Sequence, residues 1–325
     1  MRRFLVLLPT CLYFVFFPGC SEDEDPPDFA QYMREFVLDI SAYARGLDPT
    51  FLIIPQNGQE LLTVNLEANG NPATAYIAGI DGVGREDLLY GYDADDVATS
   101  QEDTDYLLGF LNVAVSQGLA VLVTDYCSTP AKIDDAYARN SASGFIPFAA
   151  NSRELDRIPA YPAGPYGQNA DDVTMLSAAR NFLYILAPDN VYGDKAAFIA
   201  AMAATNHDAL IIDLFFGDET LDVNDVGTLK TKANGGERLV IAYLSIGEAE
   251  DYQYYWRTSW QSLAPPWLDR ENPDWAGNYK VRYWLAGWQE IIFGNDASYL
   301  KKIIDAGFDG AYLDVIDAFE YYQVK

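Results

Sequence analysis

Histidine and cysteine are scarce in this chain of 325 residues, which contains one histidine and three cysteines. A zinc site with two or three histidine ligands is therefore excluded. His207 is the only partner available to a Ser-His-Asp or Cys-His pair, and it directly precedes a predicted strand, so we interpret it as structural. Carboxylates and tyrosines remain for acid–base chemistry.

Basic residues are also few, because Lys and Arg total 21 against 48 Asp and Glu, a formal net charge of −27. Such a surface repels phosphate backbones, so we expect no nucleic-acid partner. It is compatible with neutral or cationic substrates, although acidity alone is often a solubility feature. A divalent cation held by Asp and Glu stays an alternative, but no EF-hand-type spacing occurs, and we predict neither a metal nor a cofactor.

The N-terminus predicts export. A basic start precedes the apolar run "FLVLLPTCLYFVFF", which has signal-peptide length, so we assign residues 1–19 to a signal peptide. The following Gly–Cys20 pair resembles a bacterial lipobox, which implies cleavage before Cys20 and lipid attachment to its thiol. Residues 20–27 then form an acidic tether. We expect an exported lipoprotein, anchored by lipid in a membrane at the cell surface or facing the periplasm, without a protein partner.

From residue 28 onward, apolar runs alternate with helical patterns. The runs are continuous rather than alternating, which is typical of parallel strands covered on both faces. Eight such units close into a (β/α)8 barrel. Nine candidate strands occur, and we expect "GFIPFAA" to be the extra one; the nine are "TFLIIPQNG", "AYIAGIDGVGREDLLYGY", "LAVLVTDYC", "GFIPFAA", "NFLYILA", "ALIIDLFFGDE", "RLVIAYLSIGEAEDYQYYW", "YKVRYWLAGW" and "AGFDGAYLDV".

If the sheet closes into a barrel, the final strand has a neighbouring strand on each side. It would pair with the strand before it and with "TFLIIPQNG" near the start. The helix predicted over "DFAQYMREFVLDISAYARG" would then supply the crossover that is missing after the final strand. We therefore predict that residues 28–325 form one α/β domain.

Carboxylates recur where predicted strands end, which is the rim that holds the chemistry in a barrel of this kind. Two carboxylates across a glycosidic bond can hydrolyse it, one as proton donor and the other as nucleophile or base. Neighbouring aromatic residues suit a sugar-binding groove. For any single acid, capping of the following helix is the competing interpretation. The rim residues in question include Glu86, Asp125, Tyr126, Asp213, Tyr243, Glu248, Glu250, Tyr283, Trp284, Tyr312 and Asp314.

Three long motifs, "RLVIAYLSIGEAEDYQYYW", "WLDRENPDWAGNYKVRYW" and "AGFDGAYLDVIDAFEYY", resemble glycoside hydrolase family 114, the endo-α-1,4-polygalactosaminidase group. "PQNGQELL", "GREDLLYGY" and "NFLYIL" also match its bacterial and archaeal branch. The resemblance covers roughly residues 28–325 and implies a (β/α)8 barrel that hydrolyses α-1,4-linked galactosamine polymers. In many members the "PQNG" and "GxED" segments follow the "YLDxxDA" strand. Here they precede it, which implies a circularly permuted barrel.

By position, the resemblance implies catalytic roles for Asp213, Glu250 and Asp314, with Glu248 as a fourth acid. We expect substrate contacts from the rim residues Asn57, Glu86, Asp125, Tyr126, Tyr243, Tyr283, Trp284 and Tyr312. Two departures favour an alternative. Leu285 stands where the branch usually has Asp, and Gln253 replaces an Arg, so a non-catalytic, glycan-binding lipoprotein on a degenerate barrel stays open.

Overall fold

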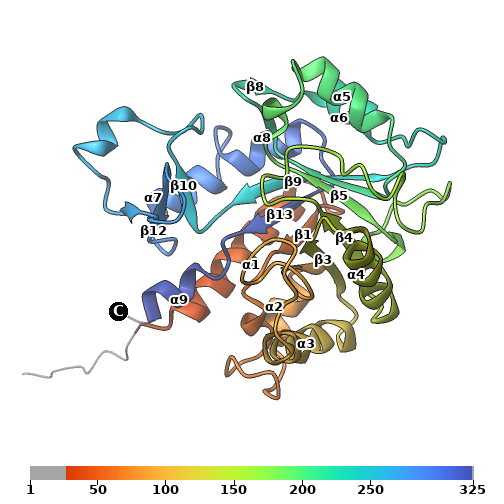
Figure 1. Cartoon of the computed structure of the whole chain (residues 1–325). Helices are drawn as coiled ribbons and strands as arrows, with labels where there is room; N and C mark the ends of the chain where they lie inside the picture. Colours follow the sequence, from red (N-terminus) through yellow and green to blue (C-terminus); the bar gives the residue numbers. More distant parts are fainter. Residues whose placement is uncertain (1–26, 324–325) are drawn as a thin grey trace, which may run out of the picture.

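The computed structural model describes residues 27–323, and its fold is mixed α/β with parallel sheets (Figure 1). The predicted signal peptide, the lipidation site Cys20 and nearly all of the tether lie outside the described residues. Within residues 27–323, no helix combines the length and the apolar character needed to cross a bilayer.

The larger sheet has five parallel strands in the order β1, β13, β9, β6, β5. The last strand of the chain pairs with the first, from Leu52 opposite Gly310 to Pro55 opposite Leu313, as predicted. Its other neighbour is β9. The strands are β1 (Leu52–Pro55), β5 (Phe182–Ile185), β6 (Ala209–Ile212), β9 (Leu239–Ser245) and β13 (Gly310–Asp314).

Three further parallel strands form a second sheet: β2 (Gly82–Glu86), β3 (Ala120–Tyr126) and β4 (Ile146–Ala150). A single parallel bridge between Gln56 and Gly84 links it to the end of β1. In the part of the chain described, no ladder joins β4 to β5, so a closed barrel stays a prediction.

The expectation about the extra strand was wrong. "GFIPFAA" contains β4, which pairs with β3 as a full member of the second sheet. The extra candidate is "YKVRYWLAGW", whose first residues belong to β12 (Asn278–Val281). This strand lies in an antiparallel side sheet with β10 (Glu248–Glu250) and β11 (Leu268–Glu271). Its mixed polar sequence suits a half-exposed antiparallel strand better than a buried parallel one.

Helices connect the parallel strands and cover them. Helix α1 begins after Asp28, whose carboxylate accepts a hydrogen bond from Gln31 N at 2.9 Å, and it buries an apolar stripe. Figure 1 shows α1 beside the C-terminal helix α9, in agreement with their contacts. The helices are α1 (Phe29–Leu47), α2 (Thr74–Ala78), α3 (Gln101–Ser116), α4 (Pro130–Ala142), α5 (Lys195–Ala203), α6 (Val223–Leu229), α7 (Ala286–Ile292), α8 (Tyr299–Asp305) and α9 (Ala318–Gln323).

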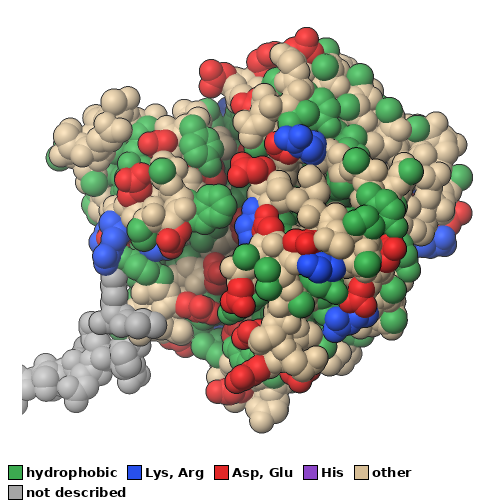
Figure 2. All heavy atoms as spheres, in the orientation of Figure 1, with side chains coloured by type: hydrophobic (Ala, Val, Ile, Leu, Met, Phe, Trp, Pro, Cys, Tyr) green, Lys and Arg blue, Asp and Glu red, His purple; other side chains and the backbone are tan. Residues whose placement is uncertain are grey.

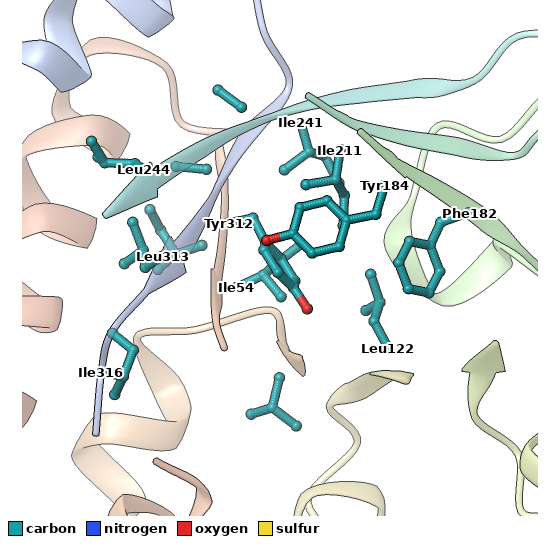
Figure 3. Packing of buried hydrophobic residues seen from close by; sticks show 14 of the residues in the cluster. Ile54, Leu122, Phe182, Tyr184, Ile211, Ile241, Leu244, Tyr312, Leu313 and Ile316 are labelled. Atoms are coloured by element: carbon teal, nitrogen blue, oxygen red, sulfur yellow. The ribbon is translucent and has the colours of Figure 1, made fainter. Parts of the chain in front are cut away.

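Aromatic and aliphatic side chains fill the space between the parallel strands (Figure 3). Figure 3 shows Tyr184 and Tyr312 meeting there, and their rings lie edge-to-face at 5.4 Å. Tyr312 reaches the backbone of Gly84, where a Cβ atom would stand only 2.0 Å from its hydroxyl oxygen. A side chain at position 84 would therefore displace a core tyrosine.

Candidate active site

The carboxyl ends of the parallel strands and the side sheet enclose a cavity of about 720 Å³. Figure 2 shows acidic side chains along the hollow between the side sheet and the rest of the molecule. Eight of the predicted site residues line this cavity: Asn57, Glu86, Tyr126, Asp213, Tyr243, Glu248, Glu250 and Asp314.

Asp125, by contrast, does not line the cavity, so its predicted contact with substrate receives no geometric support. Its buried carboxylate accepts hydrogen bonds from Leu89 N at 2.7 Å, Tyr90 N at 3.0 Å and Asn140 at 2.7 Å. It therefore holds the segment after β2 and helix α4 in place. A strand-end acid here serves the backbone, as in the capping interpretation.

Tyr283 and Trp284 also lie away from the cavity. The Tyr283 hydroxyl donates to the carbonyl of Phe29 at 2.7 Å, and the Trp284 ring lies 4.9 Å from that of Phe29. These residues dock the start of α1 against the C-terminal part of the chain. Tyr312 belongs to the core beneath the cavity and is fully buried. The prediction of substrate contact therefore receives no geometric support at any of the three.

Leu285 likewise is absent from the cavity wall. It occupies the N-cap position of helix α7, where no side-chain hydrogen bond caps the helix. An Asp at this position would be placed to cap α7. The departure from the family pattern thus changes a helix end and leaves the cavity lining intact.

Glu250 and Asp213 form one acidic pair of the cavity. Burial, followed by the charge of Asp213, raises the pKa of Glu250 to about 8. Burial also raises the pKa of Asp213 to about 6. Hydrogen bonds from Phe215 N at 2.9 Å and from the Tyr299 hydroxyl at 3.2 Å lower this pKa and so oppose the effect of burial. At pH 7 the pair therefore holds a protonated Glu250 beside an ionised Asp213.

Asp314 and Glu86 form a second pair, contributed by the last and the second strand. Burial and the charge of Glu86 raise the pKa of Asp314 to about 7. Asp314 accepts hydrogen bonds from the Tyr243 hydroxyl and from Val315 N, both at 2.7 Å. Glu86 accepts from the Tyr126 hydroxyl, and from Asn57 at 3.0 Å. Neutral donors thus orient both carboxylates.

Glu248 differs from these acids because it has a cationic partner. Its Oε1 accepts hydrogen bonds from Lys280 Nζ at 3.2 Å and from Asn272 Nδ2 at 2.8 Å. Glu248 stands directly opposite Lys280 in the register of β10 and β12. It therefore stabilises the side sheet and holds Lys280 at the cavity wall.

Several cavity residues were not predicted as site residues. The wall includes the cation Arg153, which hydrogen-bonds to Asp87 at 2.8 Å, and the acids Asp189 and Asp317. Burial raises the pKa of Asp317 to about 6. Asp317 follows the final strand in sequence and could have been found by its position. Arg153 lies in an irregular segment after β4, where no local pattern points to a site.

His207 lies outside the cavity wall and is buried. Burial, followed by the charge of Arg238, lowers its pKa to about 3, so the imidazole is neutral. Within residues 27–323, no group of three His, Cys, Asp or Glu side chains is placed to hold a metal ion.

Residues 166–324 match the model of glycoside-hydrolase family GH114. The C-terminal part of the chain, residues 166–324, is therefore similar to this family. The GH114 match runs from the segment before β5 to the C-terminal helix and contains seven of the nine cavity acids. Among them are the four predicted to be catalytic, Asp213, Glu248, Glu250 and Asp314. The cavity residues Asn57, Glu86 and Tyr126 precede the matched part.

Three curated proteins are similar to parts of this chain, and all three are described as uncharacterized. One from Methanocaldococcus jannaschii is 42% identical over 156 residues, 48% of this chain and 42% of the relative. One from Thermotoga maritima is 54% identical over 82 residues, 25% of this chain and 24% of the relative. One from Deinococcus radiodurans is 44% identical over 94 residues, 29% of each protein. The chain thus spans less than half the length of each relative.

Proposed function

We propose that this protein is a glycoside hydrolase that cleaves an α-1,4-linked galactosamine-type polysaccharide. The observation that carries the proposal is the buried pair of Glu250, whose pKa is raised to about 8, and Asp213, whose pKa is raised to about 6, in a cavity large enough for sugar rings. One carboxyl group that keeps its proton at neutral pH, next to one that does not, is the requirement for glycosidic bond cleavage. The match of residues 166–324 to GH114 supports the reaction class.

In this reaction Glu250 gives its proton to the glycosidic oxygen as the bond between that oxygen and the anomeric carbon breaks. Asp213 either attacks the anomeric carbon or takes a proton from the water that does so. Water supplies the hydroxyl group of the new reducing end in both cases. Asp314 stabilises the positive charge that develops on the sugar ring, and Glu248 acts through Lys280 as a positioning residue.

The charge of the cavity supports an amino sugar as substrate. Its wall holds two cations, and both already have carboxylate partners: Arg153 pairs with Asp87, and Lys280 pairs with Glu248. Such a wall favours a polymer that has free ammonium groups over an anionic one. The acids of the wall are Glu86, Glu154, Asp189, Asp213, Asp218, Glu248, Glu250, Asp314 and Asp317.

The eight parallel strands support a closed, circularly permuted barrel. The first and last strands pair in register, and α1 packs against the last helix. The GH114 match begins only at residue 166, after the "PQNG" and "GRED" segments. Residues 28–325 then form one catalytic domain. Export and lipid attachment at Cys20 complete the proposal and place the enzyme at a membrane surface.

The test is reducing-end release from deacetylated and from N-acetylated polygalactosamine, with the wild type beside Glu250→Gln, Asp213→Asn and Asp314→Asn. We expect the wild type to release reducing ends, with a preference for the deacetylated polymer, and the first two variants to lose activity. Binding of the polymer without release by the wild type would instead establish the glycan-binding alternative. Leu285, one of the departures that favour this alternative, does not line the cavity, whereas Gln253 does.

A further inference from the structure

Three exposed aromatic residues line the cavity wall, namely Trp275, Tyr252 and Tyr254. The ring of Tyr254 packs against the rings of Phe215 and Tyr299. Trp275 is 58% exposed and Tyr252 is 64% exposed, and both line the cavity wall. In a soluble protein, a large ring left open beside a cavity that takes a ligand marks a contact for that ligand.

Other aromatic residues in and beside the side sheet pack against one another in tilted or edge-to-face pairs. The ring of Trp256 lies 4.8 Å from that of Tyr279 and 5.3 Å from that of Trp260, which lies 5.0 Å from that of Trp267. Among residues 27–323, no aromatic ring stacks on Trp275 or Tyr252, and no Lys or Arg lies over either ring. Neither ring therefore has an aromatic or cationic partner among these residues.

The turn that presents Trp275 is held by its own hydrogen bonds. Trp275 N donates to the carbonyl of Asn272 at 3.3 Å, and Asn278 N donates to the carbonyl of Trp275 at 3.1 Å. Gly277 N donates to the side chain of Glu271 at 2.9 Å. The exposed ring thus sits on a fixed backbone, as a binding surface requires.

Tyr252 connects this surface to Glu250. Its hydroxyl makes a hydrogen bond with the Glu250 carboxyl group and lies 3.4 Å from Oδ1 of Asn278. Asn278 is also the residue opposite Glu250 in the pairing of β10 with β12. The aromatic surface therefore lies on the side of Glu250 that belongs to the side sheet.

We propose that Trp275 and Tyr252 form a stacking subsite for the pyranose ring on the leaving-group side of the scissile bond. A pyranose has an apolar face of C–H groups that packs on an aromatic ring. The assignment of the side rests on the proposed function, in which Glu250 protonates the leaving oxygen. The sugar attached to that oxygen must lie next to Glu250, where the two rings are.

Trp275→Ala tests the subsite with two substrates. The deacetylated polymer fills the leaving-group side with a sugar ring, whereas α-galactosaminyl fluoride has only fluoride there. We expect Trp275→Ala to lower kcat/KM for the polymer about tenfold or more relative to kcat/KM for the fluoride, mainly through KM. Trp275→Phe should restore most of this ratio. Tyr92→Ala is the matched control, because Tyr92 is exposed outside the cavity wall and should leave the ratio unchanged.

An equal loss with both substrates, or no loss with the polymer, would overturn the proposal. Binding separates its failure from that of the hydrolase proposal. In the Glu250→Gln background, titration with galactosamine oligomers should show weaker binding after Trp275→Ala, while galactosamine itself binds equally. That result would support the stacking subsite even if the wild type released no reducing ends. Unchanged oligomer binding would overturn the stacking subsite whether or not the wild type is a hydrolase.

Discussion

Asp213 lies close to Glu250, and its negative charge is the largest electrostatic influence on the Glu250 carboxyl group after burial. Burial and this charge together raise the pKa of Glu250 to about 8. The two residues come from different units of the chain, Asp213 from the end of β6 and Glu250 from the side sheet. Their pKa values are ordered as acid and base require, with Asp213 at about 6.

Glu250→Gln should lower kcat for the polymer by about a thousandfold, because the leaving oxygen loses its proton donor. The same variant should keep much more of its rate on α-galactosaminyl fluoride, since fluoride leaves without protonation. Asp213→Asn should lose activity on both substrates, because attack on the anomeric carbon requires Asp213 whatever the leaving group is. Equal losses for the two variants on both substrates would contradict the assigned roles.

The pH dependence of kcat/KM should be bell-shaped. Activity requires ionised Asp213 and protonated Glu250, so it should fall below about pH 6 and above about pH 8. The hydrogen bond from Tyr252 lowers the pKa of Glu250, whereas burial and the charge of Asp213 raise it. Tyr252→Phe should therefore move the alkaline limb to higher pH and leave the acidic limb in place, as measured from full pH profiles of both proteins.

Glu250 should also make stability depend on pH. Its pKa in the folded protein, about 8, exceeds its ordinary value of 4.5, so folding favours the protonated form. The resulting stabilisation is complete below about pH 4.5 and is lost as the pH rises through about 8. The glutamine of Glu250→Gln cannot ionise, so the variant does not lose this stabilisation. The Tm of the variant minus that of the wild type should therefore rise by about 2–5 °C between pH 4 and pH 9. Glu67→Gln, at an exposed position, should show no such change.

Lys232 and Asp208 form an ion pair whose side chains are both fully buried, with Nζ and Oδ1 2.8 Å apart. Lys232→Met should destabilise the protein by about 3–5 kcal/mol, because it leaves the Asp208 carboxylate buried without its cation. The control is Lys301→Met, which removes a surface i,i+4 pair with Asp305 and should cost less than about 1 kcal/mol. Urea unfolding of the three proteins measures both values.

Leu285→Asp restores the residue that is usual in this branch of the family. Because Leu285 occupies the N-cap of α7 and does not line the cavity, the substitution should change kcat/KM for the polymer less than twofold. A gain of tenfold or more would show that the missing carboxylate takes part in the reaction after all.

The pairing of the first and last strands could be predicted because both are short, apolar and flanked by helical patterns. The side sheet could not be predicted in this way. Its strands are short and mix polar with aromatic residues, and "YKVRYWLAGW" follows the same local rules as a buried strand. The packing of Tyr283 and Trp284 could not be predicted either, since their partner Phe29 lies 254 residues before Tyr283 in the chain.

The sequence by itself determined where carboxylates stand relative to the strands, because strand ends follow from local apolar runs and the turns after them. It therefore placed Asp213, Glu250 and Asp314 at one edge of the fold. Only the tertiary structure decided what each acid does. Asp125 meets backbone amides and Glu248 meets Lys280, while Glu250 meets Asp213 in a buried space. Burial and neighbouring charge set a carboxyl group's pKa, and both come from segments that are distant in sequence.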